Sequence, residues 1–217
     1  MNTIEVQRLE FSTVYPGLDE ISERLDDLNE KFLIGEINWN GSDHKPRVSF
    51  SIASSAKEIL LKYYVTEKWL RAVNTETNQE VYEDSCVEFF LSPADDGLYY
   101  NFEFNPLGTC LMGFGLRREG RKRADPVTVS MIRRKSSVYR NCGEPQAEDF
   151  FWTLTVALPF TVLCEHKISD LSGRSVRANF YKCGDRLPET HYLSWNPVKT
   201  EKPDFHRPEY FGILRFL

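Results

Sequence analysis

Polar side chains alternate with aromatic ones in the segment Tyr99–Asn105. Neighbouring side chains on a strand point to opposite faces of the sheet. The core-facing set is therefore predicted to be Tyr100, Phe102 and Phe104. The other face would carry an aromatic ring, two amides and a carboxylate, at Tyr99, Asn101, Glu103 and Asn105. Amides and carboxylates match the hydroxyl groups of a polyhydroxylated ligand, although an ordinary solvated sheet face explains the same pattern.

A second carboxylate, Glu88, stands in the apolar run Cys86–Leu91 and would share a strand face with Cys86. Buried glutamates are uncommon without a partner, so Glu88 is predicted to lie at a site or beside a basic group. Glu88 and Glu103 could also form the carboxyl pair of a glycosidase, because adjacent strands can supply the ~5 Å or ~6.5–9.5 Å separation that such enzymes use.

Two aromatic residues, far apart in the chain, stand near these polar segments. Tyr82 precedes the run that holds Glu88, and Phe205 lies in a segment rich in proline and lysine. Rings beside a polar sheet face are suited to stacking against pyranose rings. Trp195 and Arg207, from the same part of the chain, are predicted to help bind the ligand. The alternative is that Phe205 folds back onto the sheet as a plug.

Two further groups of reactive side chains allow more than one interpretation. The basic run Arg117–Arg123 could bind phosphate or an anionic polysaccharide, or it could be a solvated hairpin tip. Cys183, Asp185 and His191 could supply a thiol nucleophile with a base, but nothing in the sequence places them together.

The cysteines and histidines show no metal-ligand spacing. The five cysteines form no CxxC pair, so neither a structural zinc site nor a disulfide framework is predicted, and reduced thiols are expected. The residues concerned are Cys86, Cys110, Cys142, Cys164, Cys183, His44, His166, His191 and His206.

The elements that would position these residues are mostly strands. Leu18, Ile21, Leu25 and Leu28 fall at helical spacing after Pro16-Gly17, which predicts one short N-terminal helix. Beyond it the apolar residues recur with a period of two. The predicted strands are 47–52, 59–65, 87–91, 99–105, 109–116, 127–132, 151–158, 176–183 and 210–217, with turn signals such as Asn40-Gly41, Asp96-Gly97, Cys142-Gly143 and Cys183-Gly184 between them.

Composition fits one folded all-β unit. The chain has 217 residues, of which 41% are hydrophobic, 13% aromatic and 27% charged, so it can bury a core. We therefore predict a single antiparallel β-sandwich domain, jelly-roll-like, over residues 1–217. Helical patterns do not alternate with the strands, which argues against a βαβ enzyme fold.

The net charge, the apolar runs and the N-terminal residues limit the possible partners and the cellular location. A net charge of −5 argues against a nucleic-acid partner. No apolar run approaches the ~20 residues that span a bilayer, so no membrane segment is predicted. The start, Met1–Val6, has no signal-peptide features, which indicates a cytoplasmic protein, or a secreted or periplasmic one if a leader was trimmed.

The order of several motifs resembles the family 9 carbohydrate-binding modules, which are β-sandwich modules often attached to xylanases. The motifs are Val81–Leu91 (VYEDSCVEFFL), Tyr99–Asn105 (YYNFEFN), Trp195-Asn196-Pro197 and Phe205–Phe216 (FHRPEYFGILRF). The resemblance covers residues 30–217. It implies a non-catalytic module that binds a mono- or oligosaccharide, such as one derived from xylan or cellulose.

The resemblance also implies roles for individual residues. In the family two tryptophans hold the sugar, and by motif position Tyr82 and Phe205 stand in their places. Glu88 matches a glutamate that bonds the sugar, and Asn101 falls on an amide position. Glu103 stands where one example of the family has an arginine, which reverses the local charge. Ligand choice could therefore differ, or the site could have decayed into a protein-interaction module.

The resemblance bears on cofactors as well. No organic cofactor is expected. Calcium supports some family members, so a calcium ion stays an open expectation. Asp95-Asp96-Gly97 is a candidate loop for it, but the segment fits no EF-hand pattern and a plain turn is the favoured explanation.

Overall fold

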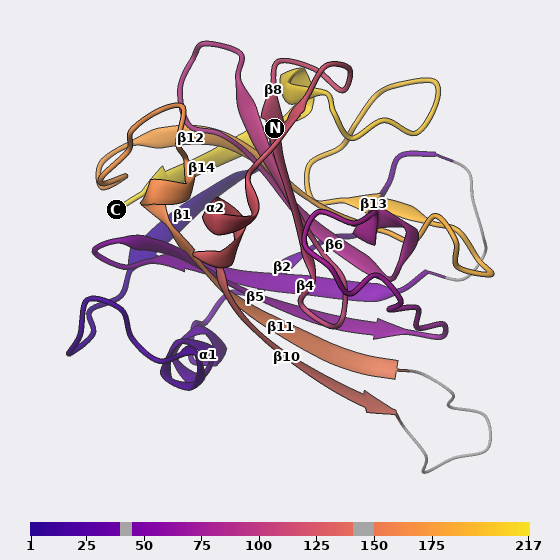
Figure 1. The fold of residues 1–217 in the computed structure, drawn as a ribbon, viewed down its shortest axis with the longest axis horizontal. Coiled ribbons are helices and arrows are strands. Elements are labelled where there is room, and N and C mark those ends of the chain that lie inside the picture. The colour runs from indigo at the N-terminus through magenta and orange to yellow at the C-terminus, as the bar shows by residue number, and fades with distance from the viewer. Residues whose placement is uncertain (40–44, 141–149) are drawn as a thin grey trace.

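The computed structural model describes residues 1–39, 45–140 and 150–217, and in these residues strands dominate (Figure 1). The strands are β1 (Thr3–Arg8), β2 (Phe32–Leu33), β3 (Glu36–Ile37), β4 (Arg47–Ser54), β5 (Glu58–Glu67), β6 (Cys86–Ser92), β7 (Tyr99–Phe104), β8 (Cys110–Gly115), β9 (Lys122–Arg123), β10 (Arg133–Arg140), β11 (Phe150–Pro159), β12 (Ser175–Cys183), β13 (Tyr192–Ser194) and β14 (Gly212–Phe216). The helical elements are α1 (Leu18–Asp26), α2 (Pro126–Ser130) and three short 3-10 turns, η1 (Val81–Glu83), η2 (Phe160–Val162) and η3 (Pro208–Tyr210).

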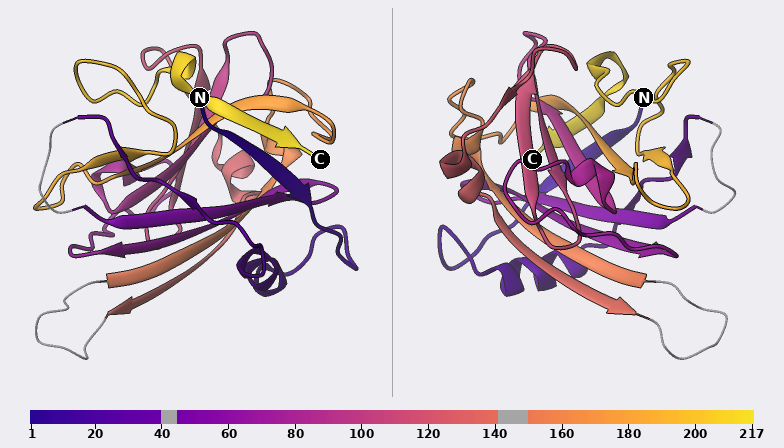
Figure 2. Two further views of the ribbon diagram at one scale, coloured as in Figure 1. Left: turned by 180° about the vertical axis from the view of Figure 1, so that it is seen from behind. Right: turned by 45° about the vertical axis from the view of Figure 1, so that its right-hand side comes forward.

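The strands form one curled sheet that folds over into two layers (Figure 2). The order is β10-β11-β5-β4-β1-β14-β12-β6-β7-β8-β9. We call the part from β14 to β9 the site layer and the part from β10 to β4 the back layer. β1 joins them, since its first residues pair with β14 and its last two pair with β4.

The predicted all-β class is therefore confirmed, with one difference in topology. Both pairings of β1 are parallel, so the sandwich is not purely antiparallel. All other strand pairings among the described residues are antiparallel. Strand β1 is not among the predicted strands, although Ile4 and Val6 alternate there with exposed residues.

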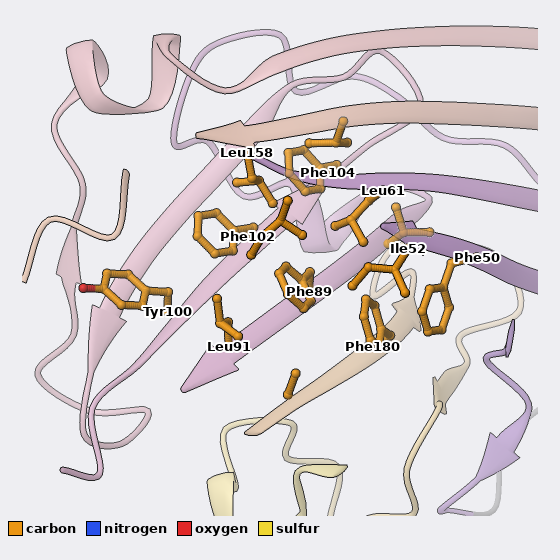
Figure 3. Packing of buried hydrophobic residues seen from close by; sticks show 14 of the residues in the cluster. Phe50, Ile52, Leu61, Phe89, Leu91, Tyr100, Phe102, Phe104, Leu158 and Phe180 are labelled. Atoms are coloured by element: carbon orange, nitrogen blue, oxygen red, sulfur yellow. The ribbon is translucent and has the colours of Figure 1, made fainter. Parts of the chain in front are cut away.

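Aromatic and branched side chains from both layers form the core between them (Figure 3). Phe50 on β4 stacks against Phe180 on β12 with ring centroids 3.7 Å apart, and Phe89 on β6 lies 4.9 Å from Phe180. Phe102 on β7 belongs to the same cluster. Offset stacking of buried rings adds to the free energy gained by removing apolar surface from water. Strands β6, β7 and β12 are fixed in this way through one face.

Helix α1 lies against the outer surface of the back layer. Its buried residues Ile21 and Leu25 pack with Leu60 and Ala157 in a separate small cluster. The helix occupies the stretch for which the sequence predicts one, directly after Gly17. It is remote from the site layer in the ribbon views (Figure 2).

One predicted strand is wrong. Residues 127–132 were expected to be extended, but Pro126–Ser130 form helix α2. Asp125 caps this helix by accepting a hydrogen bond from the Thr128 backbone N–H at 3.0 Å, and Pro126 occupies the first turn. Asp-Pro is a helix-start signal, so here local capping outweighs the strand preference of valine.

Two predicted turns, Asn40-Gly41 and Cys142-Gly143, lie outside the described residues. In the part of the chain that the structure describes, no helix is both long and apolar enough to cross a membrane.

A tight contact between the chain ends gives a test of the packing. An added Cβ at Gly212 would lie 2.8 Å from the Asn2 carbonyl oxygen and would overlap the ring of Trp195. We expect Gly212→Ala to lower the free energy of unfolding by about 1–3 kcal/mol, because overpacked sites must shift backbone or buried rings. Urea denaturation measures this. Gly35→Ala is the matched control, since no atom lies within 4 Å of its added Cβ. Equal stability of the two variants would contradict the packing described here.

Candidate functional site

A pocket of about 290 Å³ lies on the outer face of the site layer, away from the core. Its floor comes from alternate residues of β6, β7 and β8, whose neighbours in sequence point into the core. The connection between β8 and β9 forms one wall, and the segment 203–206 forms another. The residues of β7 are all buried, so the alternative of a solvated sheet face is wrong.

Five of the seven predicted site residues line this one pocket. They are Tyr82, Glu88, Asn101, Glu103 and Phe205. They come from four separate parts of the chain, namely η1, β6, β7 and the segment before η3. The fold therefore brings together residues that the sequence analysis could connect only by type and by resemblance.

Trp195 and Arg207 lie elsewhere. The Trp195 ring is 6% exposed and packs edge-on against Phe50 and Phe180 in the core. The Arg207 side chain points to solvent and pairs with Glu209 at 2.5 Å. Neither residue lines the pocket, so the prediction that they help to bind a ligand is not supported. The large ring of Trp195 is buried in the core rather than exposed in a binding site. Arg207 already forms an ion pair with Glu209 at the surface.

Glu88 and Glu103 lie directly opposite each other on β6 and β7. Both are almost fully buried, at 3% and 4% exposure. Burial raises the pKa of the Glu103 carboxyl to about 7, although Asn101 and the charges of Arg123 and Arg121 pull it down. Burial, followed by the influence of Cys183 and Glu103, raises the pKa of Glu88 well above its ordinary value. Two carboxyls that share a desolvated site resist ionising together.

Hydrogen bonds hold one side of each carboxyl. The Cys183 thiol donates to Glu88 Oε1 at 3.1 Å. Asn101 Nδ2 donates to Glu103 Oε1 at 2.8 Å. Glu103 Oε2 is buried and accepts no hydrogen bond from any residue in the described ranges. A buried acceptor without a donor is costly, so this oxygen is suited to a donor from a bound ligand.

Arg121 is a site residue that the sequence analysis did not single out. Its guanidinium donates to Asn101 Oδ1 at 2.5 and 3.0 Å and to the Tyr99 carbonyl oxygen at 3.1 Å. It also lies over the Tyr99 ring, 4.2 Å from the centroid. These contacts orient the Asn101 amide so that its nitrogen faces Glu103. The basic run is therefore not simply a solvated hairpin tip.

Gly113 makes room for this arrangement. It lies opposite Asn101 on β8, and an added Cβ there would come within 2.9 Å of Asn101 Oδ1. The absence of a side chain at this position lets the amide and the guanidinium meet above the sheet.

Aromatic rings form the side walls of the pocket. Phe205 stacks on Tyr181 with centroids 4.1 Å apart and meets Tyr192 edge-on at 6.0 Å. Tyr82 is half-buried and packs with Tyr192 and Phe205 around the same small apolar cluster. Phe205 thus partly covers the sheet, as the plug alternative required, and still lines the pocket.

Two further pocket residues, Asp185 and His206, were not predicted to bind a sugar. Asp185 follows β12, and its backbone N–H donates to the Tyr82 carbonyl oxygen at 3.0 Å. His206 is half-buried, and the loss of solvation lowers its pKa to about 3; its Nδ1 lies 3.1 Å from the Tyr99 hydroxyl. Because the His206 ring is neutral at physiological pH, the pocket's positive charge comes from arginine and lysine.

One group of side chains has donors suited to a metal. Cys86, Glu88 and Cys183 place their ligand atoms within 4.8 Å of one another, and all three are buried. Cys86 and Cys183 face each other across β6 and β12, a pairing that sequence spacing could not reveal. Two sulfur donors are soft ligands and do not fit calcium, which takes oxygen.

The candidate calcium loop forms a turn. Asp96 Oδ1 accepts from the Leu98 backbone N–H at 3.0 Å, and Asp96 Oδ2 lies 3.0 Å from His166 Nε2. Gly97 has a positive φ of 79°. Each Asp96 oxygen therefore already has a protein partner in this turn.

The residues of the suggested thiol nucleophile do not form a triad. Cys183 faces the pocket and bonds to Glu88, whereas His191 Nε2 lies 3.0 Å from Lys182 Nζ. Lys182 precedes Cys183 on β12 and so points to the opposite face. The hydrogen bond with the Cys86 thiol, followed by burial, raises the pKa of the Cys183 thiol well above its ordinary value, which disfavours a nucleophilic thiolate.

The raised pKa of Glu103 predicts a pH-dependent stability. The folded protein holds this proton up to about pH 7, whereas the ordinary value is 4.5, so wild type loses stability as the pH rises between these values. Glu103→Gln removes this loss. We expect its free energy of unfolding to increase relative to wild type by about 1–3 kcal/mol from pH 5 to pH 8.

Denaturation at several pH values measures this difference. Glu5→Gln, which replaces an exposed carboxyl on β1, controls for the loss of one negative charge. A Glu103→Gln difference that stays constant with pH would show that this carboxyl is not desolvated in solution.

Known proteins resemble the chain over nearly all of its length. The profile described as carbohydrate-binding family 9 matches residues 19–216. A crystal structure from Bacteroides uniformis, provisionally described as a carbohydrate-binding protein, is 38% identical, covers 99% of each chain and has a TM-score of 0.90.

Two family 9 modules from Caldicellulosiruptor kristjanssonii share the fold at low identity. One, in complex with glucose, has 10% identity, covers 100% of this chain and 96% of its own, and has a TM-score of 0.61. The other, in complex with cellotriose, has 12% identity, covers 99% and 93%, and has a TM-score of 0.54. No curated protein sequence matches. By its family profile, the chain belongs to carbohydrate-binding family 9.

Proposed function

We propose that this protein is a non-catalytic module that binds a mono- or oligosaccharide in the pocket of the site layer. The observation that carries this proposal is that Tyr82 and Phe205, 123 positions apart, line one pocket floored by Glu88, Asn101 and Glu103. Rings at the sides and hydrogen-bonding groups below match the two kinds of surface on a pyranose. Membership of the family supports the same function.

The polar floor is arranged to accept hydroxyl donors. Glu103 Oε2 has no partner among the described residues, and Glu88 uses one oxygen for Cys183. A sugar hydroxyl that donates to Glu103 would remove the cost of a buried, unsatisfied acceptor. The aromatic side is already fixed by the stack of Phe205 on Tyr181, so little ordering entropy is lost on binding.

We propose xylan- or cellulose-derived oligosaccharides as the first ligands to test, with a role in polysaccharide breakdown. The module bound to cellotriose supports this choice by fold alone. A pocket of about 290 Å³ holds roughly one sugar ring. Affinity is therefore expected between about millimolar and micromolar, or roughly 4 to 8 kcal/mol.

Calorimetric titration with glucose, cellotriose and xylo-oligosaccharides tests the proposal. We expect Tyr82→Ala and Phe205→Ala each to weaken binding by about tenfold or more, or roughly 1.4 kcal/mol. Tyr15→Ala, which removes an exposed ring outside the pocket, is the matched control. Absence of binding to every sugar on a glycan array, or unchanged affinity in both pocket variants, would refute the proposal.

Glycoside hydrolysis is the second candidate, because Glu88 and Glu103 oppose each other in the pocket. A glycosidase needs one carboxyl protonated and the other ionised. Here burial raises the pKa of both, which favours binding over catalysis. We expect no turnover of aryl glycosides at pH 5–8. Turnover that is lost in Glu88→Gln would instead establish an enzyme.

A decayed site used for protein interaction is the remaining alternative. The open pocket argues against it, since one buried acceptor there, Glu103 Oε2, has no partner in the described part of the chain. Capture of one defined protein partner, together with no binding to any sugar on the glycan array, would favour the protein-interaction alternative.

A further inference from the structure

The wall of the pocket formed by the β8–β9 connection is strongly basic. Arg118, Arg121, Lys122 and Arg123 all line the pocket, although the protein as a whole carries a net charge of −5. Four cations within six consecutive residues, on one wall of one pocket, are more than a neutral sugar needs for hydrogen bonding.

Arg121 is already committed to the protein. It bonds to Asn101 Oδ1 and the Tyr99 carbonyl oxygen and lies over the Tyr99 ring. The side chains of Arg118, Lys122 and Arg123 are exposed and make no hydrogen bond or ion pair with any described residue. These three therefore remain available to a ligand.

The acidic residues of the pocket do not neutralise these cations through ion pairs in the described structure. Glu88, Glu103, Asp185 and Asp204 also line it, yet none of them pairs within 4.0 Å with a cation of the basic wall in the described structure. Among the described residues, the pocket therefore presents a wall of cations without ion pairs, Arg118, Lys122 and Arg123, beside a polar floor.

We infer that the preferred ligand is a saccharide with an anionic substituent, held with its ring between Tyr82 and Phe205 and its charge against Arg118, Lys122 and Arg123. This inference rests on the proposed function. Arginine presents a planar fork of donors that matches a carboxylate or a sulfate. A concave wall of one charge sign also concentrates ligands of the opposite sign.

Matched pairs of sugars test this inference on the full chain at pH 7. Calorimetry or ligand-observed NMR compares glucose with glucuronate, galactose with galacturonate, and glucose with glucose 6-sulfate. We expect the anionic member of at least one pair to bind at least about tenfold tighter in 20 mM NaCl. This advantage should shrink in 500 mM NaCl, where screening shortens the reach of exposed charges to a few ångströms.

The variant that tests the wall is the triple substitution Arg118→Gln, Lys122→Gln and Arg123→Gln. We expect it to bring the ratio of anionic to neutral affinity close to one. The control is a second triple substitution, Lys45→Gln, Lys57→Gln and Arg117→Gln, which removes the same charge from exposed residues that do not line the pocket. This control should keep the ratio of wild type.

The outcomes separate the inference from the function on which it rests. Preference for uronates alone identifies a carboxylated ligand, and preference for the sulfated sugar alone identifies a sulfated one. Neutral sugars that bind as tightly as their anionic partners would overturn the inference and leave sugar binding intact. An equal loss of the ratio in both triple variants would also overturn it, because the effect would then come from net charge. Absence of binding to every sugar would contradict both the inference and the proposed function.

Discussion

The placement of two carboxyl groups opposite each other on adjacent buried strands determines most of the site. Glu88 and Glu103 lie in register on β6 and β7, with almost no exposure. A pair of desolvated carboxyls is unfavourable unless protons, donors or nearby cations compensate. The Cys183 thiol, the Asn101 amide and the charges of Arg121 and Arg123 each supply part of that compensation.

The arrangement of Arg121 bears on the charge reversal that the resemblance implies at position 103. The resemblance places an arginine of the family where this chain has Glu103. The described structure supplies an arginine from the next hairpin instead, with its guanidinium on Asn101 Oδ1 at 2.5 Å. Gly113 leaves the space in which the two side chains meet. The Glu103 carboxyl then lines the pocket, and Arg118, Arg121, Lys122 and Arg123 line the same pocket.

The strand pattern and the faces of β7 could be predicted from alternation alone, because the pleat fixes which side chains share a face. Phe102 and Phe104 in the core and Asn101 and Glu103 outside follow directly from it. Alternation could not show that the outer face is itself buried. That burial comes from residues 203–206 and from the β8–β9 connection, which lie far from β7 in the chain or belong to a turn.

The residues that the sequence analysis misplaced show a related limit. Tryptophan is a residue type suited to stacking on a sugar, but the Trp195 ring packs against Phe50 and Phe180 in the core, close to Gly212. The Arg117–Arg123 run has the composition of a hairpin tip, and part of it lines the pocket. Residue type does not distinguish these outcomes, because each depends on which distant segment covers the side chain.

Phe205 connects the fold to the chemistry of the site. It stacks on Tyr181, and Tyr181 follows Phe180, which stacks on Phe50 across the core and on Phe89 of the neighbouring strand β6. Successive residues of β12 therefore hold the core on one face and the pocket wall on the other. A ring fixed in this way keeps its orientation without a ligand, so the free energy of binding is not spent on ordering it. Protein stability and ligand affinity should thus be coupled through β12, since loosening the core beneath Phe180 also loosens the stack that supports Phe205.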